Sequence, residues 1–494
     1  MKYISTRGNA QSVSASSAIV RGIAEDGGLY VPASIPVWFP QDLAELSYQD
    51  IAKEIFSQYL TDFSKNEISR IIDTAYSGEA FPDGPVAATY LGDTQVLELW
   101  HGPTSAFKDM ALQVLPHLLV AALGKTGADK EIVILVATSG DTGKAALEGF
   151  CDVPHTRIIV FYPKEGVSAI QELQMNTTGG KNTRVIGIKG NFDDCQNGVK
   201  DIFGNSKLAS DMAAKGFYFS SANSINWGRL LPQIVYYFYG YADLVRKGRI
   251  RMGDLIDIAV PTGNFGNILA GWYAMRMGLP VNRFYCASNR NNVLTDALEK
   301  NIYDRCRPFY KTASPSMDIL ISSNFERFVF DISGNNSEVT SRLFRELREK
   351  GRFDMPLAYR EGIGDKMRGG YAEEADCFAA IRDVFDQYHY VMDPHTAVGY
   401  QVARSLRGDA PSCPLLLVST ASPYKFPEAV LSALQARPEN AEEMELSKAL
   451  CRLSGMPVPQ KLAELSELPV RHHLVCDKED MERAIRTDLG LDGQ

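Results

Sequence analysis

The distribution of apolar residues changes repeatedly between two patterns along the chain. Runs of consecutive apolar residues, typical of buried strands, alternate with stretches in which apolar residues recur three and four positions apart, as on one face of a helix. The predicted strands are residues 95–99, 132–137, 157–161, 184–188, 256–260 and 415–419. The predicted helices are residues 110–123, 144–150, 168–176, 194–203, 230–245 and 267–277. This alternation predicts an α/β fold in which helices cover both faces of a parallel sheet.

Other segments depart from this alternation. Helical periodicity over residues 51–60 and 67–76 precedes the first predicted strand, and a Pro- and Gly-rich stretch at 81–85 then interrupts it. Residues 301–375 are rich in Arg, Asn and Ser and contain several glycines, which predicts an irregular insertion without an assigned role. The tail from about residue 437 is charged and helical in pattern, which predicts a surface element.

The composition excludes several classes of protein. The 494 residues are 45% apolar and 22% charged, which is ordinary for a globular protein of two or three domains. A net charge of −9 disfavours a nucleic-acid binder, because such proteins need a clustered positive face. The eight cysteines form no C-x-x-C pair and the histidines show no metal-binding spacing, so we expect no metal and a reducing, cytoplasmic compartment. No apolar run is long enough to cross a membrane.

Two glycine-rich stretches lie at predicted strand-to-helix junctions. They read Ala-Thr-Ser-Gly-Asp-Thr-Gly at 137–143 and Pro-Thr-Gly-Asn-Phe-Gly-Asn at 261–267. Each can hold an anionic group, because the first N–H groups of a helix are unpaired and its dipole favours negative charge there. The alternative is a tight connection that needs small residues only for packing. The second turn lacks the P-loop lysine and the full G-x-G-x-x-G, which leaves a smaller phosphorylated cofactor, such as pyridoxal phosphate, as its natural occupant.

One lysine is placed where such a cofactor would need it. Lys108 ends a turn-forming stretch, His-Gly-Pro-Thr-Ser-Ala-Phe-Lys, just before a predicted helix. Lysine condenses with an aldehyde only as a free amine, which burial or a neighbouring cation favours. Taken alone, a Lys-Asp pair at a helix start is most often a solvated cap. Together with the two glycine-rich turns, Lys108 indicates an imine-forming lysine.

At this point the chain resembles a known family. The stretches at residues 101–109, 137–143, 223–229 and 263–267 look like those of threonine synthase, of the long bacterial and fungal type. The similarity runs over nearly the whole chain and includes elements at residues 26–29, 393–399 and 420–426. Where that family often shows a histidine after Thr-Ala near the end, this chain has Ser422.

The resemblance implies a fold and a division into domains. The fold would be that of a fold-type-II pyridoxal phosphate enzyme, also called the tryptophan-synthase-β fold, with two parallel-sheet α/β lobes and an N-terminal domain. Residues 1–93 would form the N-terminal domain and residues 94–436 the cofactor-binding catalytic region, with a smaller lobe at roughly 130–235. Residues 437–494 would form a C-terminal helical extension.

The resemblance also implies roles for individual residues. Lys108 would be the catalytic residue and would hold the cofactor as a Schiff base. The expected contacts of the cofactor phosphate are Gly263, Asn264, Phe265, Gly266 and Asn267, and Thr420 would meet the pyridine nitrogen. Unlike a carboxylate, a hydroxyl does not enforce a protonated ring, so it tunes how much charge the cofactor withdraws.

Substrate contacts are expected on two further segments. Ser139, Gly140, Asp141 and Thr142 look like the loop that receives the substrate α-carboxylate, although Asp141 would repel that group and more plausibly orients the loop or contacts the cofactor's phenolic oxygen. For a substrate phosphate we favour Arg229, whose planar guanidinium suits phosphate oxygens, with Ser224 and Asn226 as neutral neighbours. We interpret Lys144 as a solvated lysine and His395 as a structural residue.

The reaction implied is the conversion of O-phospho-L-homoserine and water into L-threonine and phosphate, with no nucleic-acid or membrane partner. Other readings stay open. Another lyase of the same fold, such as a threonine dehydratase or an O-phosphohomoserine phospholyase, would carry the same motifs, and a non-catalytic relative would bind the cofactor without turnover. A dinucleotide-dependent oxidoreductase is disfavoured, because the glycine spacing fails.

Overall fold

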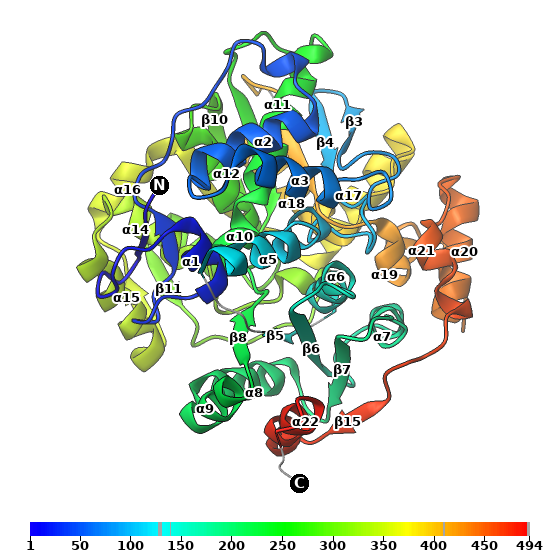
Figure 1. Cartoon of the computed structure of the whole chain (residues 1–494). Helices are drawn as coiled ribbons and strands as arrows, with labels where there is room; N and C mark the ends of the chain where they lie inside the picture. The colour runs from blue at the N-terminus through cyan, green and yellow to red at the C-terminus, as the bar shows by residue number, and fades with distance from the viewer. Residues whose placement is uncertain (127–130, 139, 409–410, 492–494) are drawn as a thin grey trace.

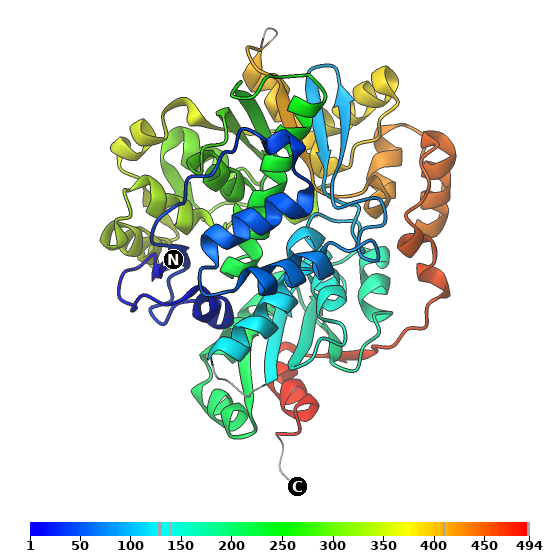
Figure 2. The same ribbon diagram turned by 45° about the horizontal axis from the view of Figure 1, so that its top comes forward.

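The computed structural model describes residues 1–126, 131–138, 140–408 and 411–491. Its N-terminal part pairs strand β1 (Tyr3–Ser5) antiparallel with β2 (Tyr30–Pro32) and adds helices α1 (Ala15–Arg21), α2 (Tyr48–Tyr59) and α3 (Lys65–Ala75). Ser47 and Ser64 start α2 and α3 as capping boxes, each reciprocated by the acidic residue three positions on. Helix α1 packs against α5, and α2 lies across α11 (Figure 2). The N-terminal part therefore covers helices of both lobes described next.

The larger lobe is built on a six-stranded sheet. Its strands are, in spatial order, β13 (Met367–Tyr371), β10 (Val281–Ser288), β9 (Ile256–Pro261), β14 (Leu415–Ser419), β4 (Thr94–Glu98) and β3 (Ala87–Leu91). Only β3 runs antiparallel to its neighbour, in a hairpin with β4. Leu416 and Val418 pack in one core with α11 (Pro232–Arg246) and α12 (Gly266–Arg276), whereas Leu415 and Leu417 pack in another with α17 (Glu374–Tyr388) and α18 (Pro394–Arg407). Helices therefore bury both faces of this sheet.

The smaller lobe has an all-parallel sheet. Its strands are, in spatial order, β15 (Leu474–Cys476), β7 (Thr183–Ile188), β6 (Thr156–Pro163), β5 (Glu131–Ala137) and β8 (Phe217–Ser221). The helices around it are α5 (Leu115–Thr126), α6 (Asp141–Phe150), α7 (Ala169–Asn176), α8 (Phe192–Gly204) and α9 (Ser206–Ala214). Figure 1 shows α8 and α9 on the side of this lobe away from the larger sheet. Two parallel-sheet lobes with an N-terminal domain confirm the expected fold class.

Some elements differ from the prediction. The helix expected over residues 110–123 is two helices, α4 (Asp109–Leu112) and α5. Pro116 lies in the first turn of α5 and has no N–H to donate to the preceding turn, so the helix restarts there. Strands β8 and β10 mix apolar and polar residues and have no clear strand pattern in the sequence. They form as strands because they pair with β5 and β9.

The insertion at residues 301–375 is not irregular, and that expectation is wrong. It contains strands β11 (Ile302–Asp304) and β12 (Arg352–Asp354), helices α14 (Phe325–Ile332), α15 (Ser337–Lys350) and α16 (Leu357–Ile363), and the edge strand β13, and helix α13 (Val293–Lys300) precedes it. The aromatic rings of Phe325 and Phe328 pack at 5.2 and 5.1 Å from the ring of Phe265. Burial of these rings offsets the polar composition of the segment.

The C-terminal segment runs along one side of the molecule (Figure 1). Helices α19 (Pro427–Ala433), α20 (Glu443–Ser454) and α21 (Gln460–Ala463) lie beside the larger lobe, and the chain then reaches the smaller lobe. There β15 adds an edge strand to β7, and α22 (Met481–Asp488) packs with α8 and α9. Of the helices in the described ranges, none is long and apolar enough to cross a membrane.

One carboxylate ties this segment to the smaller lobe. Asp488 at the end of α22 is nearly buried and pairs with Arg157 on β6 at 3.2 Å and with Arg184 on β7. We predict that Asp488→Ala lowers the free energy of unfolding by about 1–3 kcal/mol, because the half-buried guanidinium of Arg157 and the exposed one of Arg184 both lose a nearly buried acceptor. Urea unfolding followed by circular dichroism measures this difference.

The exposed Glu479 provides a matched control. Glu479→Ala removes a carboxylate from the same segment and should change the unfolding free energy by less than about 0.5 kcal/mol. Equal stability of the Asp488→Ala variant and the wild type would contradict the prediction.

Candidate active site

The expected site residues gather where parallel strands end. The loops after β4, β5, β9 and β14 all leave the carboxyl ends of their strands, which is where ligands bind in open α/β sheets. Strands β4, β9 and β14 are neighbours in the larger sheet, and β5 is a central strand of the smaller one. The geometry therefore brings together loops that lie far apart in the sequence.

The turn that carries Lys108 is joined to the loop after β14. Ala106 and Ala421 form an antiparallel bridge, the Phe107 N–H donates to the Thr420 carbonyl at 2.8 Å, and the Ser422 N–H donates to the Ser105 carbonyl at 3.0 Å. Lys108 is thus adjacent to Thr420, which is 6% exposed. Lys108 and Thr420, the two residues expected to contact the cofactor ring, therefore lie close together.

Burial controls the chemistry of Lys108. Its side chain is 12% exposed, and Nζ lies 3.7 Å from Asp141 Oδ2, too far for a hydrogen bond. Desolvation lowers the pKa of Lys108, the nearby charges of Lys425 and Arg229 add to that effect, and Asp141 opposes it. A lysine with a lowered pKa supplies more free amine at neutral pH, as an imine-forming lysine requires.

The loop expected to receive the substrate carboxylate begins α6. Gly140 precedes the helix with φ of 135°, and a Cβ there would come within 2.3 Å of Gln171. Thr142 is half-buried, whereas Ser139 lies outside the described residues. Gly140 and Gly143 both donate their N–H groups to Thr138 Oγ1, at 3.0 and 2.9 Å, which fixes the turn. The helix start therefore offers N–H donors and a positive dipole end near Lys108.

Asp141 does not present a free carboxylate to a ligand. Its Oδ1 pairs with Lys425 Nζ at 2.8 Å and accepts from Gln171 Nε2 at 3.1 Å. Burial acts to raise the pKa of this carboxyl, but Lys425 and Lys108 hold it well below its usual range. These contacts favour the expectation that Asp141 orients the loop.

The second glycine-rich turn starts α12 and is held by the insertion. Gly263 has no room for a side chain, because a Cβ would lie 2.6 Å from the Ser316 carbonyl oxygen. Ser322 Oγ donates to the Gly263 carbonyl at 2.9 Å, and Asn324 donates to the Asn264 carbonyl through both its backbone N–H and its Nδ2. Phe265 adopts a left-handed conformation, with φ of 61°. The turn is therefore a built cradle and not a loose connection.

Asn267 tests whether this cradle fits a phosphate. Its Oδ1 accepts from the hydroxyls of Tyr236 and Tyr237 at 2.7 and 2.6 Å. This arrangement fixes the amide so that Nδ2 is the free end, and Nδ2 is buried without a partner among the described residues. A buried donor without an acceptor is costly, so it indicates a ligand oxygen. The cradle residues therefore fit a phosphate group.

Arg229 is a second group that lacks a partner. It lies on α10 (Trp227–Leu230), is 3% exposed, and donates through Nη1 to the Ala222 carbonyl, while Nε has no partner among the described residues. Burial lowers its pKa to about 10, so it remains a cation at neutral pH. Among the described carboxylates, none forms an ion pair with Arg229. A buried guanidinium without a counter-ion is suited to an anionic ligand.

The two polar neighbours expected beside Arg229 behave differently. Ser224 Oγ lies 3.1 Å from Ser323 Oγ at a half-buried position, so its hydroxyl can reach a ligand. Asn226 donates both amide hydrogens to the carbonyls of Ile19 and Ser221 and accepts from the Gly228 N–H. Its side chain caps α10, and thereby positions Arg229 instead of facing the site.

Several residues of the site were not predicted from the sequence. Ser316, Ser322 and Asn324 belong to the insertion, and buried Arg327 donates to the carbonyls of Tyr30, Ser224 and Ile225. The Ser-Ser-Asn-Phe-Glu-Arg stretch at 322–327 places capping residues before an apolar run, which is a sequence signal for the start of α14.

His395 and Lys144 have structural partners. His395 Nδ1 lies 2.8 Å from Asp393 Oδ1, and the Ser316 N–H donates to His395 Nε2 at 3.2 Å, so the ring holds the insertion against α18. Lys144 Nζ donates to Glu148 at 2.9 Å and to Thr178 at 3.0 Å, so it is paired and not freely solvated.

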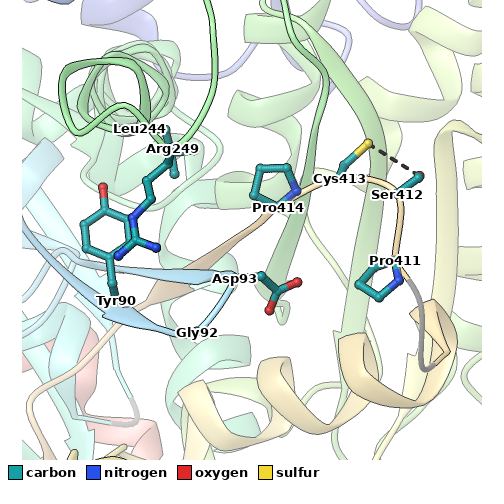
Figure 3. A pocket seen from close by; sticks show the side chains of 9 residues that line it. All are labelled: Tyr90, Gly92, Asp93, Leu244, Arg249, Pro411, Ser412, Cys413 and Pro414. Carbon is teal, nitrogen blue, oxygen red and sulfur yellow. Dashed lines mark hydrogen bonds between the residues drawn. The ribbon is translucent and has the colours of Figure 1, made fainter.

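A separate cavity of about 320 Å³ lies at the other end of the larger sheet. Figure 3 shows Asp93 and Pro414, which directly precede β4 and β14, and the guanidinium of Arg249 over the Tyr90 ring at 4.7 Å. Because these residues are at the amino ends of the strands, the cavity is not part of the site around Lys108.

The fold and the phosphate cradle beside a buried lysine define the class of protein. The family described as pyridoxal-phosphate dependent enzyme matches residues 96–418, so the chain is a pyridoxal-phosphate dependent enzyme and its cofactor is pyridoxal phosphate. The models for the threonine synthase N terminus and the threonine synthase C-terminal region match residues 2–76 and 396–485. The chain belongs to the threonine synthase family.

Individual relatives agree with this assignment. A threonine synthase from Pseudomonas aeruginosa is 36% identical, over 96% of this chain and 98% of the relative. The crystal structure of a PLP-bound threonine synthase from Brucella melitensis superposes with a TM-score of 0.87 at 34% identity, covering 99% of each chain. Yeast threonine synthase gives a TM-score of 0.87 at 32% identity, also over 99% of each chain.

Longer relatives also match. The human protein named threonine synthase-like 1 is 38% identical over 87% of this chain. This chain spans between 58% and 63% of the length of the four mammalian relatives of that name.

The fixed amide of Asn267 yields a prediction on cofactor binding. The double variant Tyr236→Phe/Tyr237→Phe removes both hydroxyls that orient this amide, and we expect the dissociation constant for pyridoxal phosphate to rise about three- to tenfold. Titration of cofactor-free protein, followed by absorbance, measures the constant. Pyridoxal, which has no phosphate, should bind equally well to the variant and the wild type.

The matched control is Tyr241→Phe on the same helix, because the Tyr241 hydroxyl donates to the Asp254 carbonyl, away from the cradle. This variant should keep the wild-type constant. An equal loss of affinity for pyridoxal and pyridoxal phosphate in the double variant would show that the hydroxyls do not act through the phosphate.

Proposed function

We propose that this protein is a threonine synthase that converts O-phospho-L-homoserine and water into L-threonine and phosphate, as a carbon–oxygen lyase acting on a phosphate. The observation that carries the proposal is Arg229, a buried cation that acts on Lys108 and whose Nε finds no partner in the described part of the chain. A substrate phosphate would satisfy both its charge and its free donor. Membership of the threonine synthase family supports the same reaction.

The proposed cofactor site uses the cradle and the neighbouring loops. Gly263, Asn264, Phe265, Gly266 and Asn267 would hold the phosphate of pyridoxal phosphate, through backbone N–H groups at the start of α12 and through Asn267 Nδ2. Lys108 would bond to the aldehyde carbon, and the Thr420 hydroxyl would meet the ring nitrogen. When bound, pyridoxal phosphate withdraws the negative charge that forms on the substrate carbon next to the amine.

The proposed substrate site lies between two helix starts. Ser139, Gly140 and Thr142 would receive the α-carboxylate at the start of α6, with Asp141 orienting the loop. Arg229 and Ser224 would hold the phosphate, and Asn226 would act through Arg229, whose helix it caps. The substrate would thus be bound at both anionic ends, which fixes its carbon chain in between.

Lys108 is the proposed proton carrier. As a free side chain, its Nζ would be a buried amine with a lowered pKa, suited to take the proton from Cα. The same amine would take a proton from Cβ as phosphate leaves Cγ and return a proton to Cγ. After water adds at Cβ, it would return a proton to Cα before threonine is released. Lys425 and Lys144 are each held by a carboxylate, which favours Lys108 as the single mobile amine for these steps.

The compartment is part of this proposal. All eight cysteines are free thiols, and three of them are buried among apolar neighbours (Cys195, Cys286 and Cys377). This agrees with the expected reducing, cytoplasmic setting.

An assay of both products tests the proposed reaction. With O-phospho-L-homoserine we expect threonine and phosphate in equal amounts. We expect Lys108→Ala to lower the rate by about a hundredfold to ten-thousandfold, because it removes the proton carrier. Amino-acid analysis and a phosphate assay measure the products. The bond between Lys108 and pyridoxal phosphate should make the protein yellow, and Lys108→Ala should lose this colour. Lys144→Ala, which changes a paired lysine nearby, should keep it.

The products also separate the alternatives. Phosphate with 2-oxobutyrate in place of threonine would assign the chain as a phospholyase. A protein that binds the cofactor and releases neither product would be a non-catalytic relative.

Replacement of Arg229 tests the substrate phosphate site. We expect Arg229→Gln to raise KM for O-phospho-L-homoserine about ten- to a hundredfold, since charge-assisted hydrogen bonds to the phosphate are lost, and to leave the protein able to bind pyridoxal phosphate. Steady-state kinetics measure this. Arg345→Gln changes an exposed arginine on α15 and serves as the control. An unchanged KM in Arg229→Gln would remove Arg229 from the phosphate site.

A further inference from the structure

One buried lysine close to the site has no role in the reaction as proposed. Lys425 ends the short 3-10 helix η4 (Pro423–Lys425), directly after the Thr420 loop, and its side chain is 0% exposed. Its Nζ lies 2.8 Å from Asp141 Oδ1, 3.0 Å from Gln174 Oε1 and 3.2 Å from the Thr104 carbonyl oxygen. An ammonium has three hydrogens, and here each one has an acceptor. The geometry therefore stabilises Lys425 in its charged form.

Asp141 lies between Lys425 and Lys108. Its Oδ1 is bonded to Lys425 and to Gln171, while Oδ2 faces Lys108 Nζ at 3.7 Å and Ser316 Oγ at 3.4 Å. One carboxylate can neutralise only one of the two lysines. Lys425 forms the short, charge-assisted contact, and Lys108 stays beyond hydrogen-bond distance.

We propose that Lys425 is a positioning residue that neutralises Asp141, so that the free amine of Lys108 stays unprotonated and able to attack the aldehyde. The inference rests on the proposed function, since it takes Lys108 as the residue that bonds to the cofactor. That bond joins Nζ to the aldehyde carbon and releases the aldehyde oxygen as water with both amine hydrogens. A protonated Lys108 lacks the electron pair that forms the bond.

The other charged groups that act on Lys108 do not replace Lys425. Arg229 on α10 acts in the same direction, and Asp109 on α4 opposes it. The Asp109 carboxylate accepts from the Thr104 N–H and Oγ1, both at 2.7 Å, and burial raises its pKa to about 6. Without Lys425, the uncompensated charge of Asp141 would keep a proton on Lys108.

The same ion pair crosses between the two lobes. Lys425 follows β14 of the larger sheet, whereas Asp141 and Gln174 lie on α6 and α7 of the smaller lobe. The third partner of Lys425, the Thr104 carbonyl, belongs to the turn that leads to Lys108. Lys425 therefore also holds the lysine turn and the start of α6 at a set distance.

A pH titration of the holoenzyme tests the proposal. The visible absorbance reports protonation of the nitrogen that joins Lys108 to pyridoxal phosphate, and its midpoint is compared between the wild type and Lys425→Met. We expect the midpoint to move to higher pH by about one to three units, because the protonated nitrogen gains the uncompensated charge of Asp141. Lys425→Arg, which keeps the charge, should stay close to the wild type.

Two further variants complete the comparison, and they still test the proposal if Lys425→Met does not fold. Asp141→Asn removes the carboxylate and should move the midpoint to lower pH, and the double variant Asp141→Asn/Lys425→Met should return it toward the wild type. A merely structural role would lower the melting temperature without moving any midpoint. Unchanged midpoints in the folded variants would overturn the proposal.

Failure of the proposed function gives a different result. Borohydride reduction and peptide mapping of the wild-type holoenzyme should place the cofactor on Lys108. A label on another residue would overturn the role of Lys108 itself, whereas a label on Lys108 with unmoved midpoints would overturn only the role of Lys425.

Discussion

The backbone pairing of residues 105–107 with residues 420–422 is the interaction on which the rest of the site depends. It extends the contact between β4 and β14 beyond the sheet, where the Leu99 N–H already donates to the Ser419 carbonyl. Through it, the turn that ends at Lys108 lies against the loop that carries Thr420 and leads to Lys425. Because backbone hydrogen bonds fix this arrangement, side chains of these loops meet with little freedom.

The charge balance of the site is opposite to that of the whole chain. The chain carries a net charge of −9, yet the site contains buried Lys425, Arg229 and Arg327, with Asp141 as the carboxylate between the lysines. Carbonyl oxygens accept from Arg327, and Asp141 pairs with Lys425, whereas Arg229 has no carboxylate partner within the described ranges. A local excess of buried donors attracts anionic ligands that the overall field would repel.

Distant parts of the chain hold the site from outside. The N-terminal part supplies carbonyl acceptors to Asn226 and Arg327, and the insertion braces the turn at Gly263 and Asn264. The C-terminal segment pairs with the smaller sheet through β15. These long segments thus have a physical reason to accompany the two lobes: the first two hold residues and turns of the site, and the third extends the smaller sheet.

The sequence by itself determined the strand–helix alternation, the parallel sheets, the two glycine-rich helix starts and Lys108, because periodicity and turn chemistry are local properties of neighbouring residues. It did not determine the order of the insertion, the break between α4 and α5, or strands β8, β10 and β15. Nor did it show that Asn226 is a cap, or that Lys425 pairs with Asp141. Only the tertiary structure decided these, since a buried charge or amide acquires its role from partners that folding brings from remote parts of the chain.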